Sequence, residues 1–382
     1  MANRGSGTGT AGDAWPEALA APSVRVLQAY DPGHDLVALR RASANGLVEL
    51  GSNENPYGPG PRALEAAAAV LGELHRYPDP LGGDLKRALA NLHGVDASRI
   101  ILGNGSHELL MQLAQAFAGP GVDVVASQFG FAVYAIAAKA VGARLCVAPA
   151  LPVDDPMPRG HDLDAIAAGI TPATRLVYLA NPNNPTGTWF AQDAFAAFMA
   201  RVPGDAIVVV DEAYAEIADA PDFGSALPLL GTYRNLVVTR TFSKAYALAG
   251  LRVGYAIGHP AVIATLERLR ESFNVNMVAL AAAEAALGDG EWLRDTVAAN
   301  AREREALAAA LRGRGWPVSP SRTNFLLVEF GERTAQVEAA LLERGVVLRP
   351  MAGYGLPGHS RISVGTATEN ARLLEALDEG VA

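Results

Sequence analysis

LVYLANPNNPTG (residues 176–187) and IVVVDEAY (residues 207–214) each join a short apolar run to a polar loop. The apolar runs are continuous rather than alternating, which is typical of strands buried on both faces of a parallel sheet. Similar runs occur at 100–102, 122–127, 144–148, 236–239 and 253–257. Because helical stretches separate them, the pattern predicts an α/β fold with a mostly parallel, seven-stranded sheet covered by helices.

The second half of the chain predicts a smaller unit. A long helical region from about Ala261 to Arg314, broken near Gly288–Gly290, precedes expected strands at 324–330, 346–349 and 361–365. The length of 382 residues also favours two domains, since single cores stop growing at ~250–300 residues. We expect a flexible N-terminal tail at 1–22, a segment at 23–58 that packs with the small domain, a large domain at 59–290 and a small C-terminal α/β domain at 291–382.

The composition argues against several classes of protein. The net charge is −9 and no run of Lys or Arg occurs, so we expect no nucleic-acid partner. The longest apolar runs are far below the ~20 residues that a membrane span needs, and the N-terminus lacks the apolar stretch of a signal peptide. Cys146 is the only cysteine, which excludes an intrachain disulfide. These features predict a cytoplasmic protein with no membrane contact.

A glycine-rich turn at Gly103-Asn104-Gly105-Ser106-His107-Glu108 connects an expected strand to a helix. Free backbone N–H groups and the helix dipole favour an anion there, so this loop is a candidate phosphate site. An ordinary turn with Ser106 as helix cap is the alternative. In open α/β sheets ligands bind beyond the carboxyl ends of the strands, so the four loops described here could meet at one site.

The loops after residues 180 and 210 offer an amide and a carboxylate. Two prolines and a glycine make Asn181–Gly187 rigid, so that Asn184 would be held at a fixed position. Asp211 ends a buried strand, where a carboxylate needs a positive partner such as a protonated pyridine nitrogen. A Walker B element is the alternative, but the chain has no matching phosphate loop. The two G-x-G-x-x-G matches, at 7–12 and 353–358, do not lie between a strand and a helix, so they do not indicate nicotinamide binding.

Lys244 follows another buried strand in Thr241-Phe242-Ser243-Lys244, and Arg252 lies eight residues further on. A single lysine is usually a solvated surface residue. A desolvated lysine, however, has a lowered pKa and becomes a nucleophilic amine that can attack a carbonyl group. The hydroxyl groups of Thr241 and Ser243 and the guanidinium of Arg252 could share a phosphate with the glycine-rich loop.

The four loops together resemble the fold-type-I aminotransferases that use pyridoxal 5'-phosphate. The stretches Ser52–Pro59, Tyr77–Asp79 and Arg361–Thr366 resemble more closely the histidinol-phosphate aminotransferases, and the resemblance extends from about Ser23 to Leu377. It implies that Lys244 binds the cofactor covalently and moves the substrate proton, and that Asp211 holds the ring nitrogen protonated. Tyr214 and Asn184 would bind the ring oxygen, and Phe131 would stack on the ring.

The remaining roles also come from the resemblance. Gly105, Ser106, His107, Thr241, Ser243 and Arg252 would hold the cofactor phosphate. Tyr77 would reach the cofactor of a second subunit, which implies a homodimer. Arg361, assisted by Arg349, would bind the anionic end of the substrate, and Asn53 and Tyr57 would line the pocket. The chain departs from the family pattern at His107, Ala135 and Ser272.

The implied reaction moves an amino group from an amine donor to a 2-oxo acid acceptor. The expected donor is L-histidinol phosphate and the expected acceptor is 2-oxoglutarate, which would place the protein in histidine biosynthesis. Alternatives are an aromatic amino acid aminotransferase acting on phenylalanine or tyrosine, a decarboxylase or lyase of the same fold, and a non-catalytic binding protein. The intact Lys244, Asp211 and Tyr214 argue against the last alternative, and no metal is expected.

Overall fold

A seven-stranded sheet dominates the computed structural model, which describes residues 19–27, 35–43 and 46–380. Its strands lie in the order β2-β8-β7-β6-β5-β3-β4, and β8 is antiparallel to both of its neighbours. Their bounds are β2 (Ile100–Gly103), β3 (Asp123–Ser127), β4 (Arg144–Ala148), β5 (Thr174–Ala180), β6 (Ile207–Asp211), β7 (Leu236–Thr241) and β8 (Gly254–Ile257). The prediction of a mostly parallel α/β sheet is confirmed.

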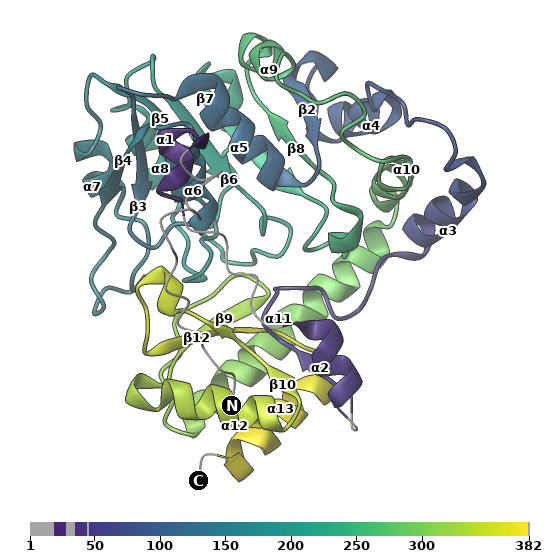
Figure 1. The fold of residues 1–382 in the computed structure, drawn as a ribbon, viewed down its shortest axis with the longest axis vertical. Helices are drawn as coiled ribbons and strands as arrows, with labels where there is room; N and C mark the ends of the chain where they lie inside the picture. The colour runs from purple at the N-terminus through teal and green to yellow at the C-terminus, as the bar shows by residue number, and fades with distance from the viewer. Residues whose placement is uncertain (1–18, 28–34, 44–45, 381–382) are drawn as a thin grey trace.

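Helices cover both faces of this sheet (Figure 1). Along β6, Val208 and Val210 belong to the core on one face, and Val209 belongs to the core on the other. This double burial explains why the strand sequences are continuously apolar. The helices are α3 (Pro61–Ala69), α4 (Gly83–His93), α5 (Ser106–Phe117), α6 (Ala132–Ala140), α7 (Leu163–Ala168), α8 (Gln192–Met199), α9 (Pro260–Leu266) and α10 (Met277–Ala286).

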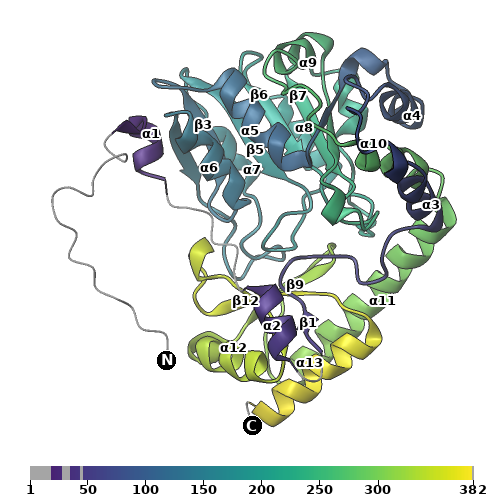
Figure 2. The ribbon, with the colours of Figure 1, turned by 45° about the vertical axis from the view of Figure 1, so that its right-hand side comes forward.

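The second part of the molecule is built on a smaller sheet, β11-β12-β9, whose strands are antiparallel. The long helix α11 extends from the end of α10 into it, and Figure 2 shows this part below the large sheet. The N-terminal strand β1 pairs in parallel with β10, so residues before and after the large sheet share one core. The elements are α1 (Pro22–Arg25), α2 (Leu36–Ala42), β1 (Val48–Glu49), α11 (Gly290–Gly313), β9 (Phe325–Glu329), α12 (Thr334–Glu343), β10 (Val346–Val347), β11 (Arg349–Pro350), β12 (His359–Ser363) and α13 (Ala367–Gly380).

Two expected elements differ from the structure. The strand expected at 346–349 is two short strands, because Val346–Val347 pairs with β1 whereas Arg349–Pro350 pairs with β12. The helical region expected from Ala261 has a further break between α9 and α10, where Phe273 has a φ of 58° and Asn276 caps α10 by accepting from the backbone of Ala279. The expected tail at 1–22 lies mostly outside the described residues. No helix in the described part of the chain is long and apolar enough to cross a membrane.

Short 3-10 helices complete the described structure. They are η2 (Leu71–Glu73), η3 (Ala97–Arg99), η4 (Leu227–Gly231), η5 (Ala249–Leu251), η6 (Gly331–Arg333) and η7 (Ala352–Tyr354). Two of them, η5 and η7, contribute Ala249 and Tyr354 to the cavity described below.

The adjacent acids after β6 have different environments. Glu212 is fully buried and pairs with Arg240, with 2.6 Å between its Oε2 and the arginine Nη2. It also accepts hydrogen bonds from Ser225 and from the backbone of Ala226. The Glu212 carboxylate therefore anchors the loop after β6 beneath the sheet, whereas Asp211 lines a cavity.

We predict that Glu212→Ala lowers the free energy of unfolding by about 3–5 kcal/mol, because it leaves the buried Arg240 with less compensation. Urea unfolding followed by circular dichroism measures the change. As a control, Asp378→Ala removes the partner of Arg314 in an exposed ion pair and should shift the urea midpoint far less. Equal shifts in the two variants would contradict a structural role for the Glu212–Arg240 pair.

Candidate active site

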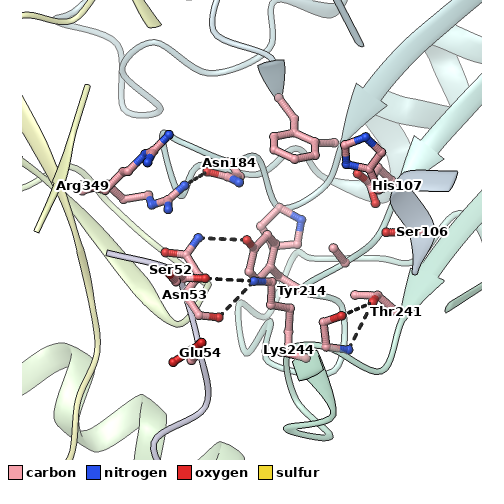
Figure 3. Close-up of a pocket in the computed structure, with 18 of the residues that line it drawn as sticks. Ser52, Asn53, Glu54, Ser106, His107, Asn184, Tyr214, Thr241, Lys244 and Arg349 are labelled. Carbon is pink, nitrogen blue, oxygen red and sulfur yellow. Dashed lines mark hydrogen bonds between the residues drawn. The ribbon is translucent and has the colours of Figure 1, made fainter. Parts of the chain in front are cut away.

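A cavity of about 290 Å³ lies at the carboxyl ends of the central strands, between the large sheet and the smaller one. Figure 3 shows side chains from both parts of the molecule around it. The lining residues include most of the predicted site residues: Asn53, Ser106, His107, Phe131, Asn184, Asp211, Tyr214, Thr241, Ser243, Lys244, Arg252, Arg349 and Arg361. Loops that are far apart in the sequence therefore meet at one place.

Asp211 is the most deeply buried acid that lines the cavity, with 5 % of its surface exposed. Its two carboxylate oxygens accept hydrogen bonds from Thr239 and Tyr134, each at 3.1 Å. Burial raises the pKa of Asp211 to about 6, against the opposing effect of these hydrogen bonds. A positive group bound in the cavity would favour the ionised carboxylate, so the site suits a cationic ring nitrogen.

Lys244 lies close to the N-terminal segment. Its Nζ donates to the backbone oxygens of Asn53 at 3.1 Å and of Ser52 at 3.3 Å, and it is 5.8 Å from the centre of the Tyr214 ring. Burial lowers the pKa of Lys244 to about 8, and the positive charge of Arg361 contributes in the same direction. A substantial fraction of this amine is therefore neutral near pH 8, as a nucleophile requires.

Arg349 and Arg361 bring positive charge to the opposite side of the cavity. They are directly paired across β11 and β12, so both side chains come from the same face of the small sheet. Arg361 donates to the side-chain oxygen of Asn184 at 2.7 Å and to the backbone oxygen of Gly51 at 2.6 Å. These bonds connect the small sheet, the rigid Asn181–Gly187 loop and the N-terminal segment.

An anion-binding arrangement surrounds the N-terminus of α5. Gly105 has a φ of 78°, which favours glycine, and a Cβ atom there would lie 2.6 Å from Nη2 of Arg252 and would displace that guanidinium group. Ser243 accepts hydrogen bonds from Thr241 at 2.9 Å and from Arg252 at 3.4 Å. Together with the free N–H groups of the helix, these side chains form a site that fits a phosphate group.

Three predicted residues, Gly105, Tyr57 and Tyr77, are not among the residues that line this cavity in the single chain. Tyr77 is 80 % exposed and stacks on Phe273, with 4.5 Å between the ring centres, and Tyr57 is half-buried elsewhere. Neither the two donors to Asp211 nor the lining residues Glu54 and Tyr354 were expected at the site from the sequence. Thr239 carried no local signal, because only the pairing of β6 with β7 brings it to Asp211.

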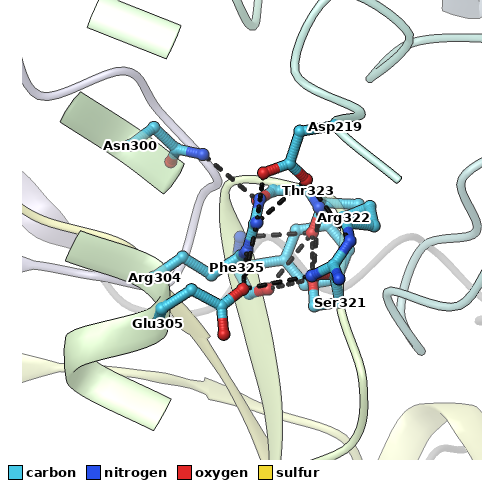
Figure 4. A network of polar contacts seen from close by, with 8 residues as sticks. All are labelled: Asp219, Asn300, Arg304, Glu305, Ser321, Arg322, Thr323 and Phe325. Atoms are coloured by element: carbon cyan, nitrogen blue, oxygen red, sulfur yellow. Dashed lines mark hydrogen bonds and ion pairs between the residues drawn. The ribbon is translucent and has the colours of Figure 1, made fainter. Parts of the chain in front are cut away.

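An ion network around the buried Arg304 connects α11 and the segment before β9 with Asp219 (Figure 4). Arg304, only 1 % exposed, donates to both carboxylate oxygens of Asp219, and Arg322 makes an ion pair with the same carboxylate. The backbone N–H of Arg322 donates to the oxygen of Gly187 at 3.1 Å. The segment before β9 therefore contacts the Asn181–Gly187 loop directly, and Asp219 links the same segment to α11.

The chain matches the family model "Aminotransferase class I and II" over residues 45–377. It is 46% identical over 363 residues to histidinol-phosphate aminotransferase 2 of Pseudomonas fluorescens, covering 94% of this chain and 96% of the relative. It is 47% identical over 361 residues to the protein of the same name from Methylococcus capsulatus, covering 94% and 97% of the two chains. The crystal structure of histidinol-phosphate aminotransferase from Sinorhizobium meliloti, solved with pyridoxal-5'-phosphate, superposes with a TM-score of 0.83 at 31% identity and covers 94% of this chain and 96% of that chain.

We predict that Gly187→Ala lowers the free energy of unfolding by at least about 1 kcal/mol, because Gly187 has a φ of 78° that disfavours other residues. The new Cβ would also lie 2.6 Å from Oγ of Ser321 and 3.1 Å from its Cα. Gly204→Ala is the matched control, since a Cβ there meets no atom within 4 Å. Equal urea midpoints for both variants would contradict a tight contact at Gly187.

Proposed function

The chain belongs to the class I and II aminotransferase family, and we propose that it transfers the amino group of L-histidinol phosphate to 2-oxoglutarate. The cofactor would be pyridoxal 5'-phosphate, held on Lys244. The observation that carries the proposal is the combination, in one cavity, of a lysine with a lowered pKa, a buried acid and two separate groups of positive charge. Family membership favours amino transfer over the decarboxylase and lyase alternatives.

The described residues fit this cofactor. Ser106, Thr241, Ser243 and Arg252 would hold its phosphate, and Asp211 would face its ring nitrogen from within the sheet. When bound, the cofactor supplies an electron-withdrawing ring that stabilises the negative charge at the substrate's reacting carbon. The chain's own contributions are electrostatic and acid–base: Asp211 keeps a proton on the ring nitrogen, and the Lys244 amine, once free, accepts and returns the substrate proton.

The paired arginines support a phosphorylated donor. Arg349 and Arg361 come from adjacent strands and face one end of the cavity, so that together they could neutralise a dianionic phosphate. An aromatic amino acid would present a single carboxylate, for which one bidentate arginine is sufficient. The charge of this subsite therefore favours histidinol phosphate over phenylalanine or tyrosine.

We also propose that the protein is a homodimer that pairs through the region around α3 and η2. Large apolar side chains are exposed there, including Leu71 at 54 %, Leu74 at 60 %, Tyr77 at 80 % and Leu81 at 64 %. A cluster of this kind is typical of an interaction surface. Tyr77 would then extend toward the cofactor phosphate of the partner. The division into domains at 59–290 and 291–382 and the cytoplasmic location remain predictions.

We predict that borohydride reduction of the protein mixed with pyridoxal phosphate attaches the cofactor irreversibly to Lys244. Peptide mass spectrometry identifies the modified residue, and Lys244→Met, which lacks the amine, is the control. An adduct on another lysine would contradict the assignment.

The pH dependence gives a second measurement on the same residue. Since the pKa of Lys244 is lowered to about 8, the neutral amine increases as the pH rises toward this value. The rate of cofactor uptake, followed by absorbance, should therefore rise with pH and level off above about 8. A rate that is independent of pH between 6 and 8 would exclude this amine as the attacking group.

For Arg349→Gln we predict at least a roughly tenfold loss of kcat/KM for histidinol phosphate, because a charge-assisted hydrogen bond contributes about 1.5–3 kcal/mol and about 1.4 kcal/mol corresponds to tenfold. The loss for phenylalanine should be much smaller, whereas Arg361→Gln should impair both substrates. Cofactor absorbance, measured in parallel, should be unchanged for Arg349→Gln. Equal losses on the two substrates would count against a phosphate subsite at Arg349.

A further inference from the structure

We propose that Asn53 and Ser363 are positioning residues that set the direction of the Tyr214 hydroxyl group, so that its hydrogen points into the cavity. The proposal rests on the proposed function, because the group that receives this hydrogen would be the cofactor. Asn53 and Ser363, which lie far apart in the chain, would therefore share one role.

Three hydrogen bonds form a directed chain. The backbone N–H of Asn53 donates to Oγ of Ser363 at 2.8 Å, so the serine oxygen is already an acceptor. The serine hydroxyl hydrogen is then directed to Oδ1 of Asn53, at 3.4 Å. With its oxygen facing the serine, the Asn53 amide presents its nitrogen to Tyr214, and Nδ2 donates to the phenol oxygen at 3.0 Å (Figure 3).

The opposite orientation of the amide is unfavourable. It would direct both Nδ2 and the backbone N–H of Asn53 at the same serine oxygen and would leave the serine hydrogen without its acceptor. All three side chains are almost inaccessible, with 1 % exposure for Asn53 and 3 % each for Tyr214 and Ser363, so water does not easily replace a lost bond.

Tyr214 retains its hydrogen, since burial raises the pKa of its phenol to about 12. Asn53 is the hydrogen-bond partner that the described residues give to the phenol oxygen, and it acts as a donor. The phenol hydrogen therefore has to turn away from Asn53. Tyr214 lines the cavity, so the hydrogen is available to an acceptor atom bound there.

The backbone conformation of Asn53 limits which substitutions can test these three hydrogen bonds. Its φ of 55° is in the left-handed region, where Asn and Asp are tolerated better than most residues. Its backbone oxygen accepts from Lys244 at 3.1 Å and from Asn324 at 3.0 Å, so a residue of different shape would disturb more than one contact. Asn53→Asp keeps the shape and the backbone preference. A carboxylate at this position only accepts hydrogen bonds, so it would draw the Tyr214 hydrogen away from the cavity.

The test is a pH titration of cofactor absorbance in the loaded protein. A donor to the cofactor ring oxygen stabilises negative charge on that oxygen, so its loss should raise the midpoint of the titration. We expect Asn53→Asp and Tyr214→Phe each to raise it by about one pH unit or more. The double variant should show no further rise, because both changes remove the same hydrogen bond. Ser363→Ala, which releases the side-chain amide and removes the acceptor of the Asn53 backbone N–H, should give a smaller rise that disappears in the Tyr214→Phe background.

Asn324→Asp is the control for the effect of added negative charge alone. Asn324 is 2 % exposed and donates to the backbone oxygens of Asn53 and Glu54, and these contacts do not involve Tyr214. A shift in Asn324→Asp as large as in Asn53→Asp, or additive shifts in the double variant, would overturn the inference while leaving the proposed function intact. A wild-type protein that takes up no cofactor would overturn both.

Discussion

The buried carboxyl group of Asp211 is the constraint on which the rest of the site depends. A parallel strand buried on both faces ends there, and an ionised acid in such a place is unfavourable without compensation. Tyr134 and Thr239 supply two hydrogen bonds, but the pKa of Asp211 is still raised to about 6. The protein's own residues therefore satisfy the Asp211 carboxylate only in part, and a bound cation would complete the arrangement.

Positive charge is distributed on two sides of this acid. Arg252 and the N-terminus of α5 form one group, at the large sheet, and Arg349 and Arg361 form the other, at the small sheet. Lys244 lies within the same field, and the nearby arginines help to lower its pKa. Positive charge at each end and a reactive amine between them suit a phosphorylated cofactor and an anionic substrate that meet at Lys244.

The N-terminal segment connects these parts. It pairs with β10 through β1, accepts hydrogen bonds from Lys244 and reaches Tyr214 through Asn53. A second connection is the network of Arg304, Arg322 and Asp219, in which the backbone N–H of Arg322 donates to the Asn181–Gly187 loop. The geometry of the cavity thus depends on contacts between the two sheets as much as on the loops of the large sheet.

The sequence by itself determined the fold class, the strands of the large sheet and loop residues such as Asn184, Asp211 and Lys244, because continuous apolar runs followed by Gly, Pro, Asp or Lys are local signals. The family resemblance, and not a local pattern, placed Asn53, Phe131, Arg349 and Arg361 at the cavity. Only the tertiary structure decided which other side chains form hydrogen bonds with these residues. Thr239 reaches Asp211 through strand pairing, and Ser363 reaches Tyr214 through Asn53, across more than 300 residues of the chain. Tyr77 has a similar limit, since its expected place depends on a second subunit, and Tyr57, which was expected to line the pocket, is not among the lining residues. Contacts of this kind arise from packing between distant segments, whereas a sequence pattern reflects only interactions between residues that are close in the chain.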